Sequence, residues 1–347
     1  MMKTYLDENK NYYKANLHCH TTRSDGRYSP EVVKEEYKKR GYSAVAFTEH
    51  DHLINSAYLT DENFVAITAC ELKVIGPKVD KYSPKPSGKL AHLNFYAKDP
   101  NCDMTPCYHE KYDWYRYEDL RHLVKYDEPY ERVYSHAGIN DMIKRGHEQG
   151  FLVSLNHPNW SLQTAEDYLG YEGLDFIEVY NNDCRRILGH HIDEAAYNDM
   201  MKAGMTVRCT ATDDNHNAGG FEGPKSDSFG GWVMIAADKL GYAELMDALE
   251  RGDFYASSGP EINSILIDDN GILKIKCSEA ERIVLITQGR RNAVVCSTDG
   301  SPITEGAFKF YEQDVRFRIR VEDKGGNAAY SQIYEIPADC PRIMPKA

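Results

Sequence analysis

The chain has 347 residues, of which 41% are hydrophobic and 27% charged, which is ordinary for a globular protein with room for one large and one small domain. Its 54 acidic and 41 basic side chains give a formal net charge of −13, which argues against general binding of nucleic-acid backbones, because such binding needs a basic surface. Neither a secretory signal in the polar stretch 1–14 nor an apolar run of membrane-spanning length is predicted.

Short apolar strands alternate with helical segments over residues 1–258. A cap at Ser29, followed by Pro30, predicts the start of a helix that Gly41 ends. Further helices are predicted at 139–149, 192–203 and 242–250. The predicted strands are 15–19, 43–48, 64–70, 90–96, 151–155, 174–179, 205–211, 232–236 and 254–257. This alternation predicts an α/β domain with a parallel sheet or barrel.

The pattern changes after Ser258-Gly259-Pro260, where strands follow one another without helices. These strands are predicted at 262–267, 272–277, 282–287, 293–297, 308–311, 315–321 and 331–336. Strict alternation in 315–321 predicts a half-exposed strand. We therefore predict a small antiparallel β-sandwich over residues 259–347.

A tyrosine-rich insertion at about 100–137 interrupts the alternation of the first domain. Its segment 108–134 holds seven of the chain's 25 tyrosines. It is interpreted as a packed surface insertion, with a lid or substrate wall, or an oligomer contact, as alternatives. The nine cysteines are scattered singly, without a C-x-x-C pair, which is typical of reduced thiols and favours a cytoplasmic location.

Metal-ligand residue types cluster just past the predicted strand ends, where barrel enzymes carry their chemistry. His18 and His20 share a face if they lie on a strand, and Asp25 can turn back toward them. The full candidate set is His18, His20, Asp25, His50, Glu71, His92, His157, Asp214 and His216. Nitrogen and oxygen ligands without thiolate suit Mn²⁺, Fe²⁺ or Zn²⁺.

In this order, the residues resemble the polymerase and histidinol phosphatase (PHP) superfamily of metallohydrolases. The matching motifs are His18-x-His20 with Ser24-Asp25-Gly26, Thr48-Glu49-His50-Asp51, Glu71, His92, His157-Pro158 and Asp214-x-His216. The resemblance implies a distorted seven-stranded β/α barrel, (β/α)7, that carries two or three divalent metal ions at the carboxyl ends of its strands.

Roles for the nine residues follow from the same resemblance. It implies a first metal held by His18, His20, Glu71 and Asp214, a second held by His92 and His157 and bridged by Glu71, and a third held by Asp25, His50 and His216. Glu71, Asp25 and His50 are accordingly the expected catalytic residues. The family more often has aspartate where this chain has Glu49, a difference that affects at most the residues around the ligands.

The implied charge favours an anionic small-molecule substrate. The positive charge of three divalent ions exceeds the negative charge of three carboxylates and one hydroxide by about two. The hydroxide is expected because a bound metal ion lowers the pKa of water toward ~7. The substrate that fits such a positively charged site best is a phosphomonoester of a small metabolite or nucleotide, which a metal-bridging hydroxide would attack. The candidate substrate contacts are Arg23, Arg27, Lys225 and Arg185.

Two further residue roles remain open at this stage. Glu178 is a candidate for orienting a ligand histidine. The acid that protonates the leaving group could be His52 or a tyrosine of the insertion.

Two other functions remain open as well. The segment 251–260, with the β module after it, resembles the carbaryl-hydrolase-like branch of the superfamily, which cleaves neutral carbamate esters. A metal-dependent carboxyl-ester, amide or carbamate hydrolase is therefore the first alternative, and it would need fewer cationic side chains around the metals. A non-catalytic, metal-containing binding protein is the second. The oligomeric state is not predicted.

Overall fold

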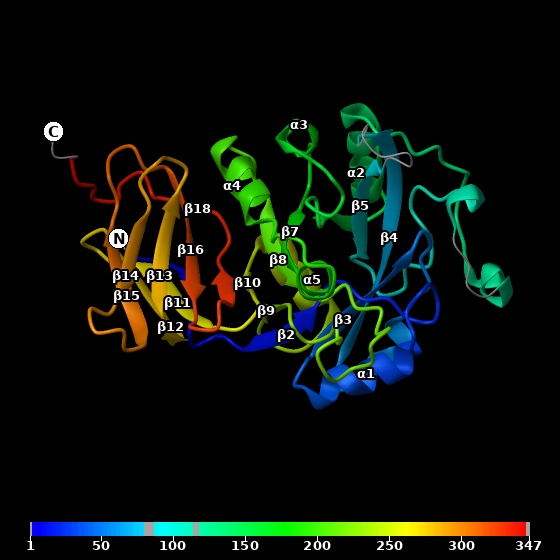
Figure 1. Cartoon of the computed structure of the whole chain (residues 1–347), viewed down its shortest axis with the longest axis horizontal. Helices are drawn as coiled ribbons and strands as arrows, with labels where there is room; N and C mark the ends of the chain where they lie inside the picture. The colour runs from blue at the N-terminus through cyan, green and yellow to red at the C-terminus, as the bar shows by residue number, and fades with distance from the viewer. Residues whose placement is uncertain (1, 80–86, 114–117, 345–347) are drawn as a thin grey trace.

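The structure is a computed structural model in which residues 2–79, 87–113 and 118–344 are described. It is a mixed α/β protein with two sheets, one of 14 strands and one of four. Helices α1 and α2 lie toward the end of the molecule opposite the N- and C-termini, α3 to α5 lie nearer the middle, and strands β11 to β16 lie at the end that holds both termini (Figure 1). No helix within the described residues is long and apolar enough to cross a membrane.

The large sheet begins with the strands that lead to the candidate ligands. These are β2 (Tyr12–Asn16), β3 (Ala44–His50), β4 (Val65–Lys78), β5 (Gly88–Ala97), β6 (Phe151–Asn156), β7 (Phe176–Asn181) and β8 (Arg208–Thr212). The pairs β2–β3, β3–β4, β6–β7 and β7–β8 are parallel, whereas β5 runs antiparallel to both β4 and β6. The parallel pairs bring several carboxyl-terminal strand ends to one side of the sheet.

Beyond β2 the same sheet continues into the C-terminal half of the chain. Strands β9 (Trp232–Ala236) and β10 (Phe254–Ser257) are followed in the sheet by β17 (Ala328–Tyr330), β16 (Arg316–Glu322), β13 (Arg282–Thr287) and β14 (Ala293–Cys296). Strand β18 (Tyr334–Glu335) also pairs with β16. The four-stranded sheet is β1 (Lys3–Leu6), β11 (Ile262–Ile267), β12 (Ile272–Ala280) and β15 (Ile303–Lys309).

The α-helices are α1 (Pro30–Lys39), α2 (His136–Glu148), α3 (Ala165–Tyr168), α4 (Glu194–Lys202) and α5 (Tyr242–Arg251). Ser29 caps α1 with Pro30 in its first turn, as its sequence predicts. Gly252 ends α5 with a φ of 83°, a conformation that glycine adopts without a side-chain clash. Short 3-10 turns lie at Ala57–Leu59, Glu110–Tyr112 and Glu118–Leu123, and a π-turn, η4, at Asp183–Ile187.

Among the described residues, two apolar clusters are larger than the others. The larger is formed by β2 to β10 with helices α2, α4 and α5. In the second, Ile265 and Ile275 of the small sheet pack in one cluster with Ile283 and Phe317 of the large sheet. Hydrogen bonds order the large sheet as a path and do not close it into a ring among the described residues, so the seven-stranded barrel and the sandwich stay predictions.

Several strand predictions differ from the structure, and β4, for example, continues to Lys78, eight residues past the predicted strand 64–70. The predicted strand 15–19 ends at Asn16, and the predicted strand 308–311 is replaced by β15, which ends at Lys309. Of the predicted strand 331–336 only β18 (Tyr334–Glu335) forms, and β17 precedes it at Ala328–Tyr330, because Ser331 and Gln332 leave the ladder. The Ser331 hydroxyl accepts a hydrogen bond from the Ile319 backbone, and the Gln332 amide reaches β8 and β10.

The N-terminal strand β1 and the burial of Arg318 also differ from the sequence prediction. Strand β1 pairs with β11, so residues that the predicted boundary at 258 assigns to the first domain lie in the small sheet. Arg318 is not on an exposed face of β16 but fully buried, since Glu194 and Asn198 of α4 bind its guanidinium. All nine cysteines are free thiols.

Candidate metal centre

A single backbone bridge aligns the first and last candidate motifs. Cys19 and Asn215 form an isolated parallel bridge, in which His20 donates to the Asn215 carbonyl at 3.0 Å and Asp214 donates to the His18 carbonyl at 2.9 Å. The flanking residues His18, His20, Asp214 and His216 therefore project to one side, toward the site. The prediction that His18 and His20 lie on a strand is wrong, because β2 ends at Asn16, but their shared direction is as expected.

At the position predicted for the first ion, four side chains lie within hydrogen-bonding distance of one another. The His18 Nε2 atom lies 3.3 Å from Glu71 Oε1 and 3.1 Å from Asp214 Oδ1. The His20 Nε2 atom lies 3.0 Å from Asp214 Oδ1 and 3.5 Å from Glu71 Oε2. These are the four residues that the resemblance assigns to the first ion.

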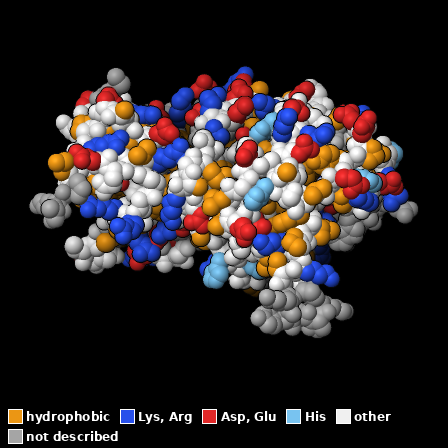
Figure 2. All heavy atoms as spheres, turned by 90° about the horizontal axis from the view of Figure 1, so that it is seen from above, with side chains coloured by type: hydrophobic (Ala, Val, Ile, Leu, Met, Phe, Trp, Pro, Cys, Tyr) orange, Lys and Arg blue, Asp and Glu red, His pale blue; other side chains and the backbone are white. Residues whose placement is uncertain are grey.

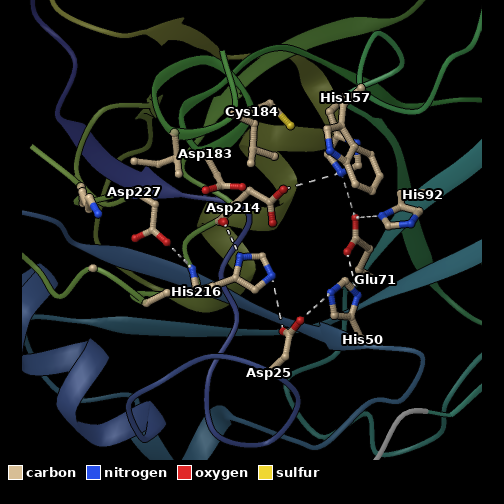
Figure 3. Close-up of a pocket in the computed structure, with 16 residues that line it drawn as sticks. Asp25, His50, Glu71, His92, His157, Asp183, Cys184, Asp214, His216 and Asp227 are labelled. Atoms are coloured by element: carbon tan, nitrogen blue, oxygen red, sulfur yellow. Dashed lines mark hydrogen bonds and ion pairs between the residues drawn. The ribbon is translucent and has the colours of Figure 1, made fainter. Parts of the chain in front are cut away.

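Glu71 lies at the centre of the arrangement (Figure 3). Its Oε1 atom lies 3.0 Å from His92 Nδ1, 3.3 Å from His157 Nε2 and 2.9 Å from Asn156 Nδ2. Its Oε2 atom lies 3.0 Å from His50 Nδ1. One carboxylate thus contacts side chains from all three predicted ligand sets.

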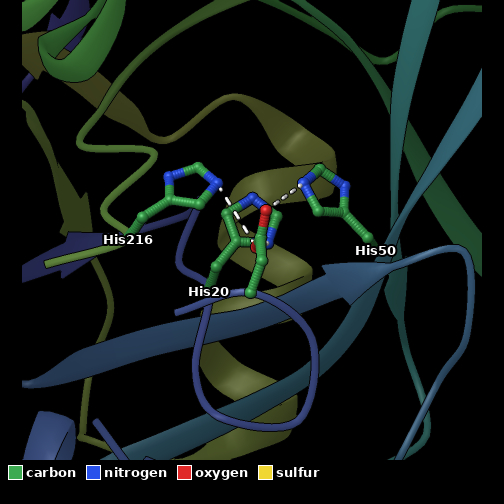
Figure 4. A group of neighbouring side chains, drawn as sticks. His20, His50 and His216 are labelled. Carbon is green, nitrogen blue, oxygen red and sulfur yellow. Dashed lines mark ion pairs between the residues drawn. The ribbon is translucent and has the colours of Figure 1, made fainter. Parts of the chain in front are cut away.

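The third group surrounds Asp25. Its carboxylate lies 3.5 Å from His50 Nε2 and 3.4 Å from His216 Nε2. The His20 ring is stacked between His50 and His216, with ring centroids 4.2 and 4.4 Å away (Figure 4). Gly26 allows the Asp25 loop to approach, because a Cβ there would lie 2.4 Å from the His20 carbonyl oxygen.

The protonation of Glu71 and His20 suits cation binding. Burial raises the pKa of the Glu71 carboxyl, but the imidazoles of His92 and His18 outweigh this and hold it well below its usual value. Burial, together with His50 and His216, lowers the pKa of His20 to about 4, so its imidazole is neutral. Among the described residues, the buried atoms His20 Nδ1 and His92 Nε2 have no hydrogen-bond partner. Such a set of imidazole and carboxylate donors fits divalent transition metals.

Three combinations of these side chains bring their ligand atoms close enough to hold an ion. They are His20, Asp25, His50 and His216; His18, Glu71 and His157; and His18, His20 and Asp214. His157 and Asp214 also have left-handed backbone φ angles, of 27° and 53°. Residues other than glycine adopt such angles at a cost that is typical of functional sites.

Glu178 connects two of the candidate ligands from behind. Its Oε1 lies 2.6 Å from His18 Nδ1 and accepts from the Thr212 hydroxyl at 2.7 Å. Its Oε2 accepts from the His157 backbone at 3.1 Å and from the Asn181 amide, which also donates to Asp214. This contact matches the orienting role suggested for Glu178, whereas Asn181 was not among the predicted residues.

Replacing Glu178 by glutamine should weaken metal binding by about 10- to 100-fold, the usual effect of losing a carboxylate that orients a ligand histidine. Titration calorimetry of the metal-free protein with Mn²⁺ measures this affinity. The exposed Glu166 offers a matched control, E166Q, which should bind as the parent does. An E178Q affinity equal to that of the parent would rule out the orienting role.

A cavity of about 600 Å³ opens over Glu71, His92, His157, Asp214 and His216. Its other lining residues are Asp25, His50, Trp160, Asp183, Cys184, Ile187, Leu188, Ala218, Gly219, Lys225 and Asp227. On the face of the molecule seen from above, acidic and basic side chains are interspersed with hydrophobic ones (Figure 2).

The predicted substrate-binding arginines do not line this cavity. The Arg23 guanidinium donates to Ser56 and Tyr58, and that of Arg27 donates to the Ala218 carbonyl. Arg185 is exposed outside the cavity lining. Among the described lining residues Lys225 is the one lysine or arginine.

The described part of the tyrosine-rich insertion is anchored beside the metal site but does not line the cavity. Arg132 forms a buried ion pair with Asp51, the residue after His50, and donates to the Cys107 carbonyl. His52 is bound to Asp113 of the insertion at 2.9 Å. These contacts favour a packed insertion over a lid, and they leave His52 outside the cavity lining.

Asp183 lines the cavity but was not predicted from the sequence. It lies at the start of η4, beside Asp214 (Figure 3). Burial and the neighbouring Asp214 raise the pKa of its carboxyl to about 7. No sequence motif surrounds it, and only its position after a strand end would have indicated it.

The sequence matches no protein-family model and no curated protein. Among solved structures, the chain is similar to a two-domain protein from Bacteroides vulgatus described as containing a predicted PHP-like metal-dependent phosphoesterase. The two sequences are 16% identical and the TM-score is 0.45, over 95% of this chain and 96% of that one. It is also similar to a suggested metal-dependent phosphoesterase from Bifidobacterium adolescentis, at 17% identity and a TM-score of 0.34, over 60% and 90% of the two chains.

A third similar structure is an amidohydrolase from Chromobacterium violaceum with bound sulfate and no metal, at 14% identity and a TM-score of 0.34, over 56% of this chain and 84% of that one. At such identities and TM-scores the activity of this chain has to be inferred from its own side chains. The likeness to the carbaryl-hydrolase-like branch stays a prediction.

Proposed function

We propose that this protein is a metal-dependent hydrolase that cleaves phosphomonoesters of small metabolites or nucleotides. The observation that carries the proposal is the gathering of six imidazoles and three carboxylates beneath a cavity that a small molecule could enter, with Glu71 in contact with five of the imidazoles. His18, His20, Glu71 and Asp214 would hold one ion; Glu71, His92 and His157 a second; and Asp25, His50 and His216 a third.

Bound divalent ions would activate water and neutralise negative charge on the ester. The chain's own residues would supply the rest. Glu71 would join two ion positions, Asp25 and His50 would face the third, and Glu178 would hold His18 and the His157 backbone in place. Lys225 at the cavity wall would attract an anionic substrate.

A metal-dependent hydrolase of carboxyl esters, amides or carbamates is the second candidate. It is favoured by the scarcity of cationic side chains around the cavity, since a neutral substrate needs none. The apolar wall formed by Trp160, Ile187 and Leu188 is compatible with either substrate class. A binding protein without turnover would not need so complete a set of ligand-type residues.

Inorganic phosphate provides the test that separates the two hydrolase candidates. If the substrate is a phosphomonoester, millimolar phosphate should inhibit the Mn²⁺-loaded protein competitively, because product and substrate share the same anionic group. The screen uses phosphomonoesters, phosphodiesters and carboxylic esters, each with and without phosphate. Turnover of carboxylic esters alone, at a rate unaffected by phosphate, would favour the second candidate.

We also propose the finer fold that the family resemblance implies. In that view β2 to β8 form the distorted seven-stranded barrel, and Gln332 supports it by connecting β8 to β10: its side chain accepts from the Cys209 backbone at 2.7 Å and donates to the Phe254 carbonyl at 3.1 Å. The shared core of the small sheet with β13 and β16 supports a β-sandwich in the C-terminal half. The division near residue 258 and the cytoplasmic location remain predictions.

A further inference from the structure

The outer wall of the cavity is apolar, in contrast to its floor. Trp160, Ile187 and Leu188 line it together, although Ile187 is 39% exposed and Leu188 49% exposed. Large aliphatic side chains at the mouth of a polar site are typical of surfaces that contact a ligand. The wall adjoins the groups that would bind the reacting ester, so its occupant is the rest of the same substrate.

This wall is held in place by hydrogen bonds from the site itself. The Cys184 backbone donates to the Asn181 side chain at 2.9 Å, and the Asp183 backbone donates to the Asp213 carbonyl at 3.0 Å. The Leu188 backbone in turn donates to the Asp183 carbonyl at 3.1 Å. The turn η4, which carries Ile187, is therefore fixed relative to the end of β7 and to the loop after β8.

Trp160 is positioned by two candidate ligands. Its ring packs edge-on against His157, with ring centroids 5.0 Å apart, and is tilted against His92 at 5.3 Å. A wall assembled in this way presents its apolar surface before a ligand arrives, which lowers the entropic cost of binding.

The polar part of the rim argues against a second anionic group on the substrate. Asp183 and Asp227 both line the cavity, and Asp227 accepts hydrogen bonds from the backbones of His216 and Asn217. Lys225 is the one lysine or arginine in the described lining. A leaving group that carried more phosphates or carboxylates would face these acids without enough compensating positive charge.

We propose that the leaving group of the substrate is an uncharged, apolar group that rests on Trp160, Ile187 and Leu188. This inference rests on the proposed phosphomonoesterase function and narrows its substrate class. It favours a monoester of an apolar alcohol over a sugar phosphate or a polyphosphate.

The test compares ligands that differ only in their apolar part. Binding of the uncleavable benzylphosphonate and methylphosphonate to the Mn²⁺-loaded protein is measured by calorimetry. Turnover is measured with benzyl phosphate and glycerol 1-phosphate, whose leaving alcohols have similar acidity. The variants are L188S and, as a matched control, L169S, because Leu169 is 39% exposed and lies outside the cavity lining.

We expect benzylphosphonate to bind about tenfold more tightly than methylphosphonate, and L188S to reduce that preference about fivefold, as removal of a half-buried leucine contact should. In L188S the kcat/KM for benzyl phosphate should fall in parallel, while the kcat/KM for glycerol 1-phosphate stays as in the parent. The L169S control should keep the parent values for both substrates. Equal binding of the two phosphonates, or a preference that L188S leaves intact, would overturn the inference while the phosphoesterase function stands. If neither phosphonate binds and neither phosphate is cleaved, both the function and the inference fail.

Discussion

Replacing Glu71 by glutamine is expected to lower metal content and turnover together. The substitution keeps the shape of the side chain but removes the one charge that lies within 3.5 Å of His18, His20, His50, His92 and His157. A carboxylate that joins two ions stabilises both, and we expect the loss to cost about 4 kcal/mol in the transition state, or about a thousandfold in kcat/KM.

Elemental analysis of the purified variant measures metal content, and the phosphomonoester that the parent cleaves best reports turnover. The exposed Glu172 offers the matched control E172Q, which should retain both properties. An E71Q variant with full metal content and full rate would contradict the bridging assignment. A variant that retains its metal but loses turnover would place Glu71 in the reaction without a bridging role.

Local sequence patterns were sufficient for most of the secondary structure. Strands β9, β10, β11 and β13 begin and end where their apolar runs predict, and α1 begins at its Ser29 cap. The errors occur where a distant contact decides the local conformation. Ser331 and Gln332 lie in an apolar run, yet they leave the sheet because their side chains bind backbone groups of β16, β8 and β10.

The nine candidate ligands could be selected from the sequence because their residue types and order agree, and the structure brings them together, although Glu71 and His92 lie within β4 and β5 and not after a strand. What no local pattern contains is the bridge between Cys19 and Asn215, which aligns two of the motifs across almost two hundred residues. The same limit explains why the pairing of β1 with β11 was not predicted, since the two strands are more than two hundred and fifty residues apart.

Substrate contacts were predicted least well, because nearness in sequence does not give the direction of a long side chain. Arg23 and Arg27 flank the first motif, but Arg23 turns to Ser56 and Tyr58, and Arg27 turns to the Ala218 carbonyl. The wall that does line the cavity comes from Trp160, Ile187 and Leu188, which lie on two separate loops and carry no motif.

Replacing Glu194 by glutamine is expected to destabilise the whole protein by about 3 kcal/mol. Glu194 begins α4 and forms ion pairs with Arg318 and Arg320 of β16. Burial alone would raise the pKa of its carboxyl, but the two guanidinium groups outweigh this and lower it, so the pair is charged. In E194Q the fully buried Arg318 would keep only the neutral Asn198 as a side-chain hydrogen-bond partner among the described residues, and an uncompensated buried charge is costly.

Urea unfolding measures the effect, and the same strand supplies the control. Arg316 of β16 pairs with Glu335 at 3.3 Å, but the Glu335 side chain is 74% exposed, so E335Q should cost less than about 1 kcal/mol.

The comparison also tests what the C-terminal strands do for the site. Asp193, next to Glu194, accepts a hydrogen bond at 2.7 Å from the backbone of Asn159, beside Trp160, so the ion pair lies one residue from a contact that supports the cavity wall. A free energy of unfolding no lower in E194Q than in E335Q would mean that the shared sheet and apolar packing alone join the two halves.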